Sequence, residues 1–338
     1  MVTQKDIARR AGVSVSVVSA VVNGTSHTRM SDETRERVEA VLTEVGYVPN
    51  DAARSLRRQR AGTIAVVVEK VDNPVYRDMF HGIYDAAEAR GWAVVLGDTI
   101  WMQSGSHFLA RLLGRGSIDG ILLRHDGIID ETVMRLLRTQ QTPVVTLEGR
   151  HAPDGRWLAV DDVGAGRIAT AHLIELGHRE IAYVGGGRAF VTTARYDGYV
   201  TQMREAGLTA RALVATEFGF EAGSKGLVMA LAQRPRPTAV VVNNVISGIG
   251  LLAAAHDAGL QIPEDLSVIA IHDAEIADNV RPTLSTVKLP MAELGTRAVE
   301  EIATALDGRP PRAGILHDPA PQVIMRGSSA PPTSGQPS

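Results

Sequence analysis

The sequence predicts an α/β protein: a small N-terminal head of three helices, then a short linker and two doubly wound parallel-sheet lobes. Three observations lead to this prediction. Residues 3–46 hold three short apolar patterns at helical spacing, with a three-residue turn between the first two. From Thr63 onward, short continuous Val/Ile runs alternate with helical patterns. This alternation comes in two successive series, each with the form of one doubly wound sheet.

Composition limits the class of protein. The chain has 338 residues, so we expect two or three domains. Its 44% apolar and 22% charged residues are typical of a soluble globular protein. No run reaches the roughly 18 apolar residues of a membrane span, and the lack of cysteine excludes disulfides and thiolate metal sites. Lys5, Asp6 and Arg9 stand where a secretion signal needs an apolar core, so we expect a cytoplasmic protein.

Charge is unevenly distributed along the chain. Residues 1–60 hold 10 Lys/Arg against 7 Asp/Glu, a net charge of +3. The remainder holds 25 against 31, a net charge of −6. A basic head on an acidic body points to a polyanionic partner, although surface variation alone also produces such a difference.

The first two predicted helices lie close together. Thr3 followed by Asp6 has the form of a capping box. Apolar residues follow at helical spacing, and Gly12 supplies a turn. Ser14 then caps a second helix that runs through Asn23. The apolar stripe of this second helix consists of Val17, Val18, Val21 and Val22.

The third helix completes the head. Ser31 caps it, Asp32 and Glu33 lie at its positive dipole end, and Gly46 ends it. Its buried face is expected to be Val38, Val41, Leu42 and Val45. Such a unit is a helix-turn-helix. Turn spacing alone does not separate this interpretation from a small helical cap on a larger enzyme.

The head and the stretch GYVPNDAARSLRRQRAG after it resemble the LacI/GalR family of bacterial transcription regulators. The resemblance covers nearly the whole chain in order and is highly specific. The matching positions in the head are Asp6-Ile7-Ala8, Ala11-Gly12-Val13-Ser14, Val18-Ser19, Val21, Asn23, Thr34-Arg35, Val38, Gly46-Tyr47 and Pro49-Asn50. The resemblance implies a DNA-binding head on a body like the periplasmic sugar-binding proteins.

The resemblance also implies which residues contact DNA. The second helix would lie in the major groove, with Val15, Ser16 and Ala20 facing the bases. Most members have Arg at the position of Ala20 and Thr at that of Val17. Because Arg is best suited to a guanine edge, we expect an unusual operator code with more weight on DNA shape. The remaining DNA contacts that we expect are Thr3, Ser14, Ser19, Asn23, Asn50, Ala53, Arg54, Leu56 and Arg57.

The linker at 49–61 is expected to act as a hinge. Asn50 caps a short helix over about 51–58, and Leu56 matches the family's wedge residue, which opens the minor groove and bends the duplex. Arginines surround the wedge and neutralise phosphates; they are Arg54, Arg57, Arg58 and Arg60. Since such a short helix is marginal alone, the alternative is a solvated linker.

In the body, continuous Val/Ile runs predict strands buried on both faces of parallel sheets. The predicted strands are Ile64–Val68, Ala93–Leu96, Ile121–Leu123, Val144–Leu147, Ile181–Val184, Val240–Val242 and Val268–Ile271. The predicted helices lie near 77–90, 105–115, 130–140, 164–177, 194–206, 220–233 and 247–259.

The resemblance implies that the chain crosses between the lobes more than once. We expect a head over 1–48, the hinge over 49–61 and a core over 62–330. Within the core, lobe 1 would be about 62–159 plus 289–316, and lobe 2 about 160–288 plus 317–330. The Pro/Ser-rich tail from Ser328 is expected to be disordered, with 331–338 outside the core.

Ligands of open parallel sheets bind beyond the carboxyl ends of the strands. The polar residues at these ends are Asp72, Asn73, Asp98, Glu148, Asp161, Arg195, Asn244, His272 and Asp273. The resemblance makes Arg195 the effector-binding arginine, Asn244 a polar contact and Phe218 an aromatic that stacks on a sugar. By residue type alone, Phe218 is a core residue and Asp161 caps a helix.

Two positions depart from the family's pattern. Its Asn-Asp pair reads Asn244-Val245 here, and its two consecutive acids read His272-Asp273. The acid aligned with His272 commonly binds sugar hydroxyls, and an imidazole cannot accept two hydroxyl bonds as a carboxylate does. Either the sugar lies in a different pose, or the effector is acidic or phosphorylated.

No motif proposes a reaction, a metal or a cofactor. A nucleophile elbow, a Walker loop and metal-ligand histidine spacing are all lacking in the sequence. We therefore expect a repressor that binds a near-palindromic DNA operator as a homodimer and responds to a carbohydrate effector. The alternatives are an activator, a transport binding protein, which needs a signal peptide and no head, and a sugar-metabolising enzyme with a regulatory head.

Overall fold

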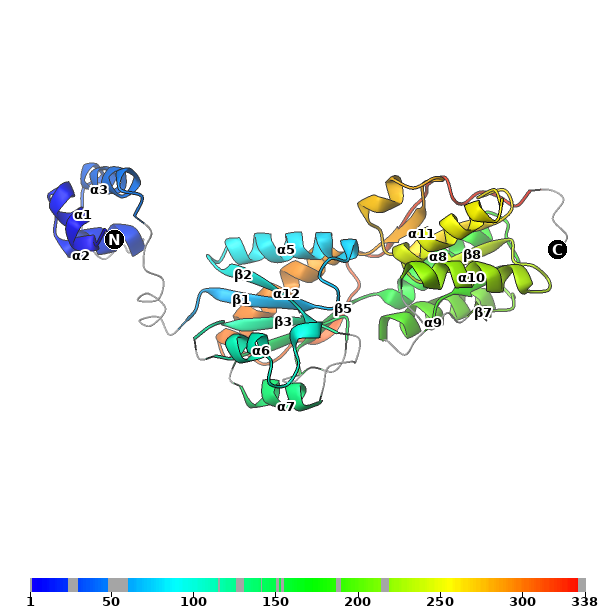
Figure 1. The fold of residues 1–338 in the computed structure, drawn as a ribbon, viewed down its shortest axis with the longest axis horizontal. Helices are drawn as coiled ribbons and strands as arrows, with labels where there is room; N and C mark the ends of the chain where they lie inside the picture. Colours follow the sequence, from blue (N-terminus) through cyan, green and yellow to red (C-terminus); the bar gives the residue numbers. More distant parts are fainter. Residues whose placement is uncertain are drawn as a thin grey trace. The chain divides into compact units, whose positions relative to one another are not determined.

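A computed structural model describes residues 2–23, 30–47, 60–114, 116–125, 131–140, 142–149, 152, 155–186, 190–213 and 219–333. The chain divides into two compact units, Met1–Ala61 and Gly62–Ser338 (Figure 1). The predicted fold class, a helical N-terminal region followed by two parallel-sheet lobes, is confirmed. The expected hinge helix lies outside the described residues.

The first unit contains the three predicted helices, which are α1 Gln4–Ala11, α2 Val15–Asn23 and α3 Asp32–Glu44. Thr3 and Asp6 form the predicted capping box, in which each backbone N–H is bound by the other's side chain. Gly12 then adopts a left-handed φ of 65°, which a side chain would disfavour, and this turns the chain into α2. The fully buried centre of the unit consists of Ile7, Val18 and Val38.

The first lobe is built on a six-stranded sheet in the order β11-β5-β4-β3-β1-β2, parallel throughout. Its strands are β1 Thr63–Val68, β2 Ala93–Asp98, β3 Gly120–Arg124, β4 Val144–Leu147, β5 Trp157–Val160 and β11 Ala313–Leu316. Its helical elements are η1 Pro74–Tyr76, α5 Arg77–Glu88, η2 Thr99–Trp101, α6 His107–Leu112, α7 Glu131–Thr139 and α12 Met291–Leu306. In β1, Val66 packs towards α5 and α12, whereas Val67 packs towards α6 and α7. A strand buried on both faces therefore explains the unbroken Val run.

The second lobe repeats this plan with the order β12-β10-β9-β8-β6-β7, and only the β10–β12 pair is antiparallel. Its strands are β6 Ile181–Val184, β7 Arg211–Leu213, β8 Ala239–Val242, β9 Ser267–Ile271, β10 Ser285–Lys288 and β12 Gln322–Ile324. Its helical elements are α8 Asp162–Glu175, α9 Phe190–Glu205, α10 Phe220–Ala232, α11 Val245–Asp257 and η3 Glu275–Asp278. Tyr183 packs with α8 and α9, and Val184 packs with α10 and α11.

The chain passes between the lobes at three places. It leaves the first lobe after β5, returns to it after β10, and leaves again after β11 (Figure 1). The carboxyl ends of both sheets consequently face the junction of the two lobes. No helix among the described residues is long and apolar enough to span a bilayer.

Several elements were not predicted. The strands β5, β7, β10, β11 and β12 and the helix α12 are absent from the sequence-based assignment. β7 has only three residues, Arg211–Leu213, and β10 reads Ser-Thr-Val-Lys, so neither shows the continuous apolar run of the others. Short polar strands are stabilised by their partners in the sheet, which a local pattern does not reveal.

The expectation that the chain is disordered from Ser328 is wrong for its first residues. Ser328 is fully buried, accepts a hydrogen bond from the Ser285 amide at 2.8 Å and donates one to the Val268 carbonyl at 2.7 Å. The Ala330 carbonyl is bound by Ser267. Ser328 and Ser329 are buried and form hydrogen bonds that attach this segment to β9 and β10, so they do not indicate disorder. Residues 334–338 lie outside the described residues.

Replacing Ser328 with Ala tests this attachment. The substitution leaves a buried amide and a buried carbonyl without their hydroxyl partner, so we expect the free energy of unfolding to fall by about 1–3 kcal/mol. Thr333→Ala is the matched control, because Thr333 is exposed and makes only a long hydrogen bond of 3.4 Å; its effect should stay within about 0.5 kcal/mol. Equal, small effects in urea unfolding would contradict the attachment.

Candidate functional site

The first unit exposes one face of α2. Val15 is 40% exposed and Ser16 is exposed. The hydroxyl of Ser16 lies 2.7 Å from that of Ser14, so the start of the helix presents two hydroxyl groups beside an apolar side chain. This combination is suited to base edges and phosphate oxygens in a groove of the duplex.

Ala20 is a correction to the expected base-facing set. Its side chain is only 4% exposed, so its methyl group is not presented on the open face with Val15. A single methyl group reaches less far from the helix axis than neighbouring side chains and is covered by them. This burial contradicts the expectation that Ala20 is exposed towards the bases.

Other expected DNA contacts are placed as follows. Thr3 is exposed, but its hydroxyl is used in the α1 cap, donating to Asp6 at 2.7 Å. Ser14 accepts a hydrogen bond from the Val17 amide at 3.4 Å, and Ser19 is half-buried. Asn23 is the last residue of α2. The remaining expected contacts, Asn50, Ala53, Arg54, Leu56 and Arg57, lie outside the described residues.

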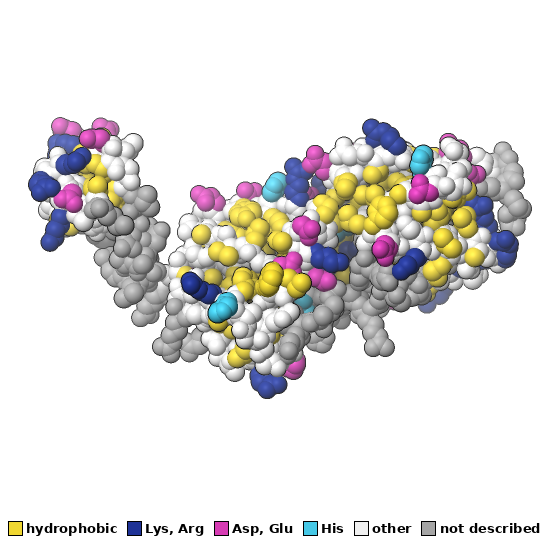
Figure 2. Space-filling model, in the orientation of Figure 1, with side chains coloured by type: hydrophobic (Ala, Val, Ile, Leu, Met, Phe, Trp, Pro, Cys, Tyr) yellow, Lys and Arg dark blue, Asp and Glu magenta, His cyan; other side chains and the backbone are white. Residues whose placement is uncertain are grey.

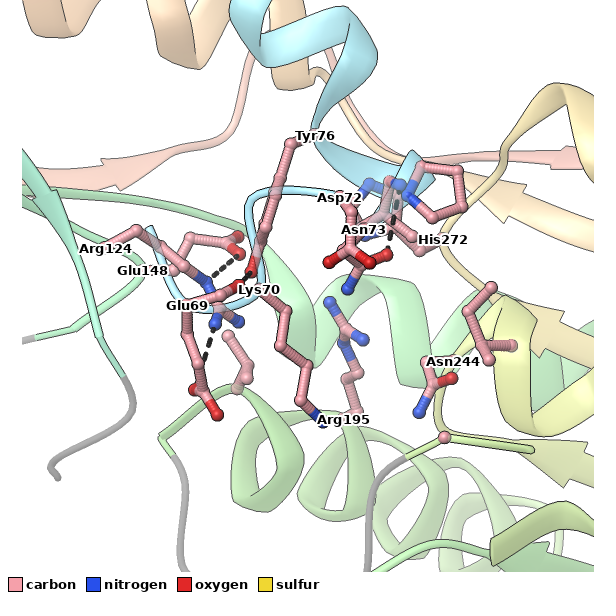
Figure 3. A pocket seen from close by; sticks show the side chains of 15 residues that line it. Glu69, Lys70, Asp72, Asn73, Tyr76, Arg124, Glu148, Arg195, Asn244 and His272 are labelled. Atoms are coloured by element: carbon pink, nitrogen blue, oxygen red, sulfur yellow. Dashed lines mark hydrogen bonds and ion pairs between the residues drawn. The ribbon is translucent and has the colours of Figure 1, made fainter. Parts of the chain in front are cut away.

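The second unit contains a pocket of about 290 Å³ lined by residues of both lobes. One wall is the segment from the end of β1 through η1, together with the ends of β3 and β4; the other is formed by α9, the start of α11 and the end of β9 (Figure 3). Six of the polar residues predicted at the strand ends line it: Asp72, Asn73, Glu148, Arg195, Asn244 and His272. The pocket brings these six residues together.

Three expected effector residues are not among the lining residues. Asp98 accepts hydrogen bonds from two backbone amides, Asp161 caps α8, and Asp273 binds Arg326 at 2.8 Å and Thr286 at 2.5 Å. A short carboxylate at a strand end readily finds a nearby amide or cation, and these interactions hold the three acids away from the pocket. Phe218 lies outside the described residues.

Arg195 on α9 is the most constrained cation of the pocket. It is buried, and its Nε donates to Asp162 at 2.6 Å while Nη1 donates to the carbonyl of Asn243 at 2.8 Å. Burial opposes the charge of Arg195, but Asp162 and Glu148 more than offset this and raise its pKa. Burial also raises the pKa of Asp162 to about 6, although Arg195 opposes that shift. The two side chains form a single buried ion pair.

Glycine in α8 makes this geometry possible. A Cβ on Gly166 would collide with the carbonyl oxygen of Arg195, so any larger residue would push α9 away. Gly198 of α9 is in the same position with respect to the carbonyl of Val163. The two helices therefore approach backbone to backbone, and this approach sets Arg195 against Asp162.

Glu148 and Arg124 form the opposite wall. The Arg124 Nε lies 3.8 Å from Glu148 Oε2, its Nη1 lies 4.0 Å from Glu69 Oε2, and its guanidinium stacks 5.4 Å from the centre of the Tyr76 ring (Figure 3). Glu148 is buried, and its Oε1 has no hydrogen-bond partner in the described part of the chain. A buried carboxylate oxygen without a donor is a place for a donor from a ligand.

The backbone of the pocket is unusual. Lys70, Glu148 and His272 have φ values of 55°, 56° and 76°, and they are the non-glycine residues with positive φ among the described residues. All three line the pocket. Residues held in this region cost about 1–3 kcal/mol each and tend to cluster at ligand-binding sites, so the coincidence marks the pocket as a functional site.

His272 is uncharged in this setting. Burial, with the nearby charges of Arg195 and Arg124, lowers the pKa of His272 to about 3, while a hydrogen bond to the backbone of Val75 opposes the shift. The imidazole therefore contributes no charge to the pocket at neutral pH.

Sequence reasoning missed four polar lining residues: Glu69, Lys70, Tyr76 and Arg124. Lys70 follows the end of β1, and Arg124 is the last residue of β3. The strand-end rule that selected Glu148 would have found both, had it been applied to cations as well as to acids and amides.

Two protein families match this chain, one in each of its two compact units. Residues 3–50 match the family "Bacterial regulatory proteins, lacI family", and residues 170–329 match a periplasmic binding protein-like domain. The chain is 32% identical over 303 residues to the HTH-type transcriptional repressor PurR of Erwinia tasmaniensis, covering 88% of each chain. It is 32% identical over 305 residues to the ribose operon repressor of Haemophilus influenzae, covering 89% of this chain and 91% of the relative.

A solved structure is also similar to this chain. A LacI family transcriptional regulator from Mycobacterium smegmatis superposes with a TM-score of 0.71 at 34% identity, covering 80% of this chain and all of the other.

The protonation state of His272 can be tested through acid stability. Its pKa changes from about 6.5 in the unfolded chain to about 3 in the fold, so on acidification the unfolded chain takes up a proton that the folded chain does not. Stability must therefore fall as the pH drops from about 7 to about 5, with His272 contributing about 2 kcal/mol of the loss. We expect His272→Asn to lose that much less in urea unfolding. An equal loss would contradict a neutral buried imidazole.

Proposed function

Because this chain belongs to the LacI family of bacterial regulatory proteins, we propose that it is a transcriptional repressor whose α2 reads a DNA operator and whose interlobe pocket binds the controlling effector. The observation that carries the proposal is the pocket. Its walls come from both lobes, and the three left-handed residues Lys70, Glu148 and His272 all line it. A ligand there can bind one arrangement of the lobes better than another.

The DNA-binding role of the head is supported by its charge and its exposed helix. Residues 1–60 carry a net charge of +3, whereas the rest of the chain carries −6. Val15 and Ser16 on α2 are exposed and available to base edges, and the sequence carries arginines at 54, 57, 58 and 60 that suit phosphates. With Ala20 withdrawn, we infer that direct reading of bases is limited and that the deformability of the operator contributes much of the specificity.

Control requires the pocket to sense the arrangement of the lobes. Val75 of η1 packs on the core of the second lobe, and its backbone is hydrogen-bonded to His272. At the rim, Arg77 of the first lobe forms an ion pair with Glu275 of the second. A ligand that strengthens or breaks these interlobe contacts shifts the population between two states, and only this differential affinity can change operator binding.

We propose that the repressor is a homodimer, because two heads are needed for a near-palindromic operator. The surface that supports this lies at the edge of the first lobe. β2 is an edge strand whose Val95 is 45% exposed, and Ile100 and Trp101 of η2 after it are 62% and 64% exposed. Figure 2 shows hydrophobic side chains gathered over α5 and β2. Such a patch on a sheet edge is typical of an interface.

We propose a carbohydrate as the effector and the cytoplasm as the compartment. The Glu148 Oε1 atom, which has no hydrogen-bond partner among the described residues, suits a hydroxyl donor, and a regulator of this kind acts where the chromosome lies. The test of the function is selection of duplexes from a random pool by the purified protein, followed by screening of sugars and sugar derivatives for release. Retention of no duplex over random competitor would contradict it.

Two substitutions should separate the two activities. Leu56→Ala removes the expected wedge and should weaken operator binding at least tenfold without changing ligand affinity, because the bend depends on the inserted side chain.

Arg195→Lys keeps a cation beside Asp162 but loses the planar fork of the guanidinium. It should abolish release by ligand while operator affinity is retained.

Fluorescence anisotropy of a labelled operator and calorimetry of the ligand measure both effects. An unchanged operator affinity in Leu56→Ala, or a normal ligand response in Arg195→Lys, would contradict the corresponding assignment.

The dimer surface predicts a change in assembly. Trp101→Glu places a charge in the exposed apolar patch and should raise the dimer dissociation constant about 30-fold or more, as for loss of an aromatic anchor of about 2 kcal/mol. Met325→Glu is the control, since Met325 is 67% exposed on the second lobe, away from β2. Analytical ultracentrifugation checks both; an unchanged dimer in Trp101→Glu would place the interface elsewhere.

A further inference from the structure

We propose that the effector is an anionic carbohydrate, with its carboxylate or phosphate bound by Lys70, Asn73 and Arg195 and its hydroxyl-bearing body directed to Glu148. This inference rests on the proposed role of the pocket as the effector site and names the chemical class of the ligand. The sequence leaves two explanations for a histidine at position 272: a sugar in a different pose, or an effector that is acidic or phosphorylated. The inference selects the second.

The first support is a set of unused donors that share one end of the pocket. Arg195 spends Nε and Nη1 on Asp162 and Asn243, and its Nη2 makes no hydrogen bond in the described chain. Asn73 accepts the Val75 amide through Oδ1 at 3.2 Å, which leaves its Nδ2 as a donor. Figure 3 shows the amide nitrogen of Asn73 and the guanidinium of Arg195 directed towards one another. Two donors that face each other need an acceptor between them.

Lys70 adds a second cation to the lining of the pocket. Its side chain extends along the pocket to the helix that carries Arg195 (Figure 3), and it forms no ion pair within the described residues. Its left-handed backbone, with φ 55°, holds it in the pocket wall. Asp72 also lines the pocket, but it is exposed at the rim, where solvent screens its charge.

The second support is the absence of an opposing acid at position 272. His272 lines the same end of the pocket, is buried, and is hydrogen-bonded to the backbone of Val75. Because the imidazole is neutral, it adds no negative charge to those of Asp162 beside Arg195 and of Glu148 and Glu69 beside Arg124. An acid at position 272 would repel an anionic ligand, and a neutral imidazole does not.

The third support is the helix α11. It has 13 residues, Asn244 caps it, and Ile246 of its first turn lines the pocket. The first turn of a helix leaves backbone N–H groups without intrahelical acceptors and carries a partial positive charge. This field acts on the same cavity as Arg195 and favours an anion there.

Glu148 excludes a simple inorganic anion as the preferred ligand. Its buried Oε1 lacks a donor among the described residues, so the ligand must also supply hydroxyl or amine hydrogens at that wall. The cavity of about 290 Å³ lies at the lower end of the range for small-molecule sites, which suits a ligand of monosaccharide size. An anionic monosaccharide fits both ends.

The test compares matched ligands on the purified full-length protein by isothermal titration calorimetry. The sets are glucose, gluconate, glucuronate and glucose 6-phosphate; galactose, galactonate and galacturonate; and ribose, ribonate and ribose 5-phosphate. We expect an anionic member to bind at least about tenfold tighter than its neutral parent, the gain of one charge-assisted hydrogen bond. The tightest member tells carboxylate from phosphate. Binding of a neutral parent as tight as its anion, or binding of no anion, overturns the inference.

Substitutions at two positions make the test specific to this end of the pocket. His272→Asp restores an acid there and should lower the anion-to-neutral affinity ratio at least about tenfold, whereas His272→Asn, which stays neutral, should preserve the ratio. Lys70→Gln changes an exposed side chain, and so provides a folded variant; it should lower the affinity for the anion alone. Unchanged ratios in His272→Asp and Lys70→Gln would overturn the inference.

Operator release distinguishes this inference from the function on which it rests. Release by a neutral sugar alone would refute the anionic class and leave the repressor function in place. Tight binding of an anionic sugar with no effect on any selected operator would retain the ligand class and refute the control.

Discussion

The buried ion pair between Arg195 and Asp162 is the interaction on which the rest of the pocket depends. Removing two charges from water costs several kcal/mol for each, so such a pair is retained only where its geometry is closely held. Here Gly166 and Gly198 bring α8 and α9 into backbone contact, and that contact sets Nε of Arg195 2.6 Å from the carboxylate. The pair leaves one edge of the guanidinium for the cavity. A fixed cation at the junction of two lobes follows directly from helix packing.

The other features of the pocket adjust to that cation. Glu148 lies opposite in a left-handed backbone conformation, with one carboxylate oxygen that has no partner in the part of the chain that the structure describes, and His272 stays neutral beside the arginine. The walls belong to different lobes, and the chain passes between those lobes at three places. A ligand that contacts both walls can therefore change the position of one lobe relative to the other. In the sequence, residues 49–61 connect the head to β1, which begins at Thr63, so the first lobe is covalently joined to the DNA-binding unit.

Much of this was predictable from the sequence, and the failures have physical causes. Continuous apolar runs such as the one ending at Val68 indicate strands buried on both faces, because a strand with one exposed face carries polar residues at alternate positions. β10 was not predicted, because its buried Ser285 is stabilised by a hydrogen bond from its amide to Ser328. This contact joins segments that are distant in the sequence, so no local pattern reveals it. Position at a strand end predicted His272 as a residue of the pocket; Arg195 also lines the pocket, but from within α9. Position at a strand end failed for Asp273, because it does not reveal that Arg326 binds its carboxylate. The resemblance to known regulators supplied the roles, but not the burial of Ala20.

Control of the operator by the effector requires ligand binding in the pocket and operator binding by the head to be thermodynamically coupled. The most direct measurement is the dissociation constant of the effector for the free protein and for the protein saturated with its operator duplex. Linkage requires the two constants to differ by the same factor by which the effector changes operator affinity, a factor of about 5–150 in coupled systems. Agreement of the two factors, both different from one, is the result expected here. An effector that binds free and operator-bound protein equally well would contradict it.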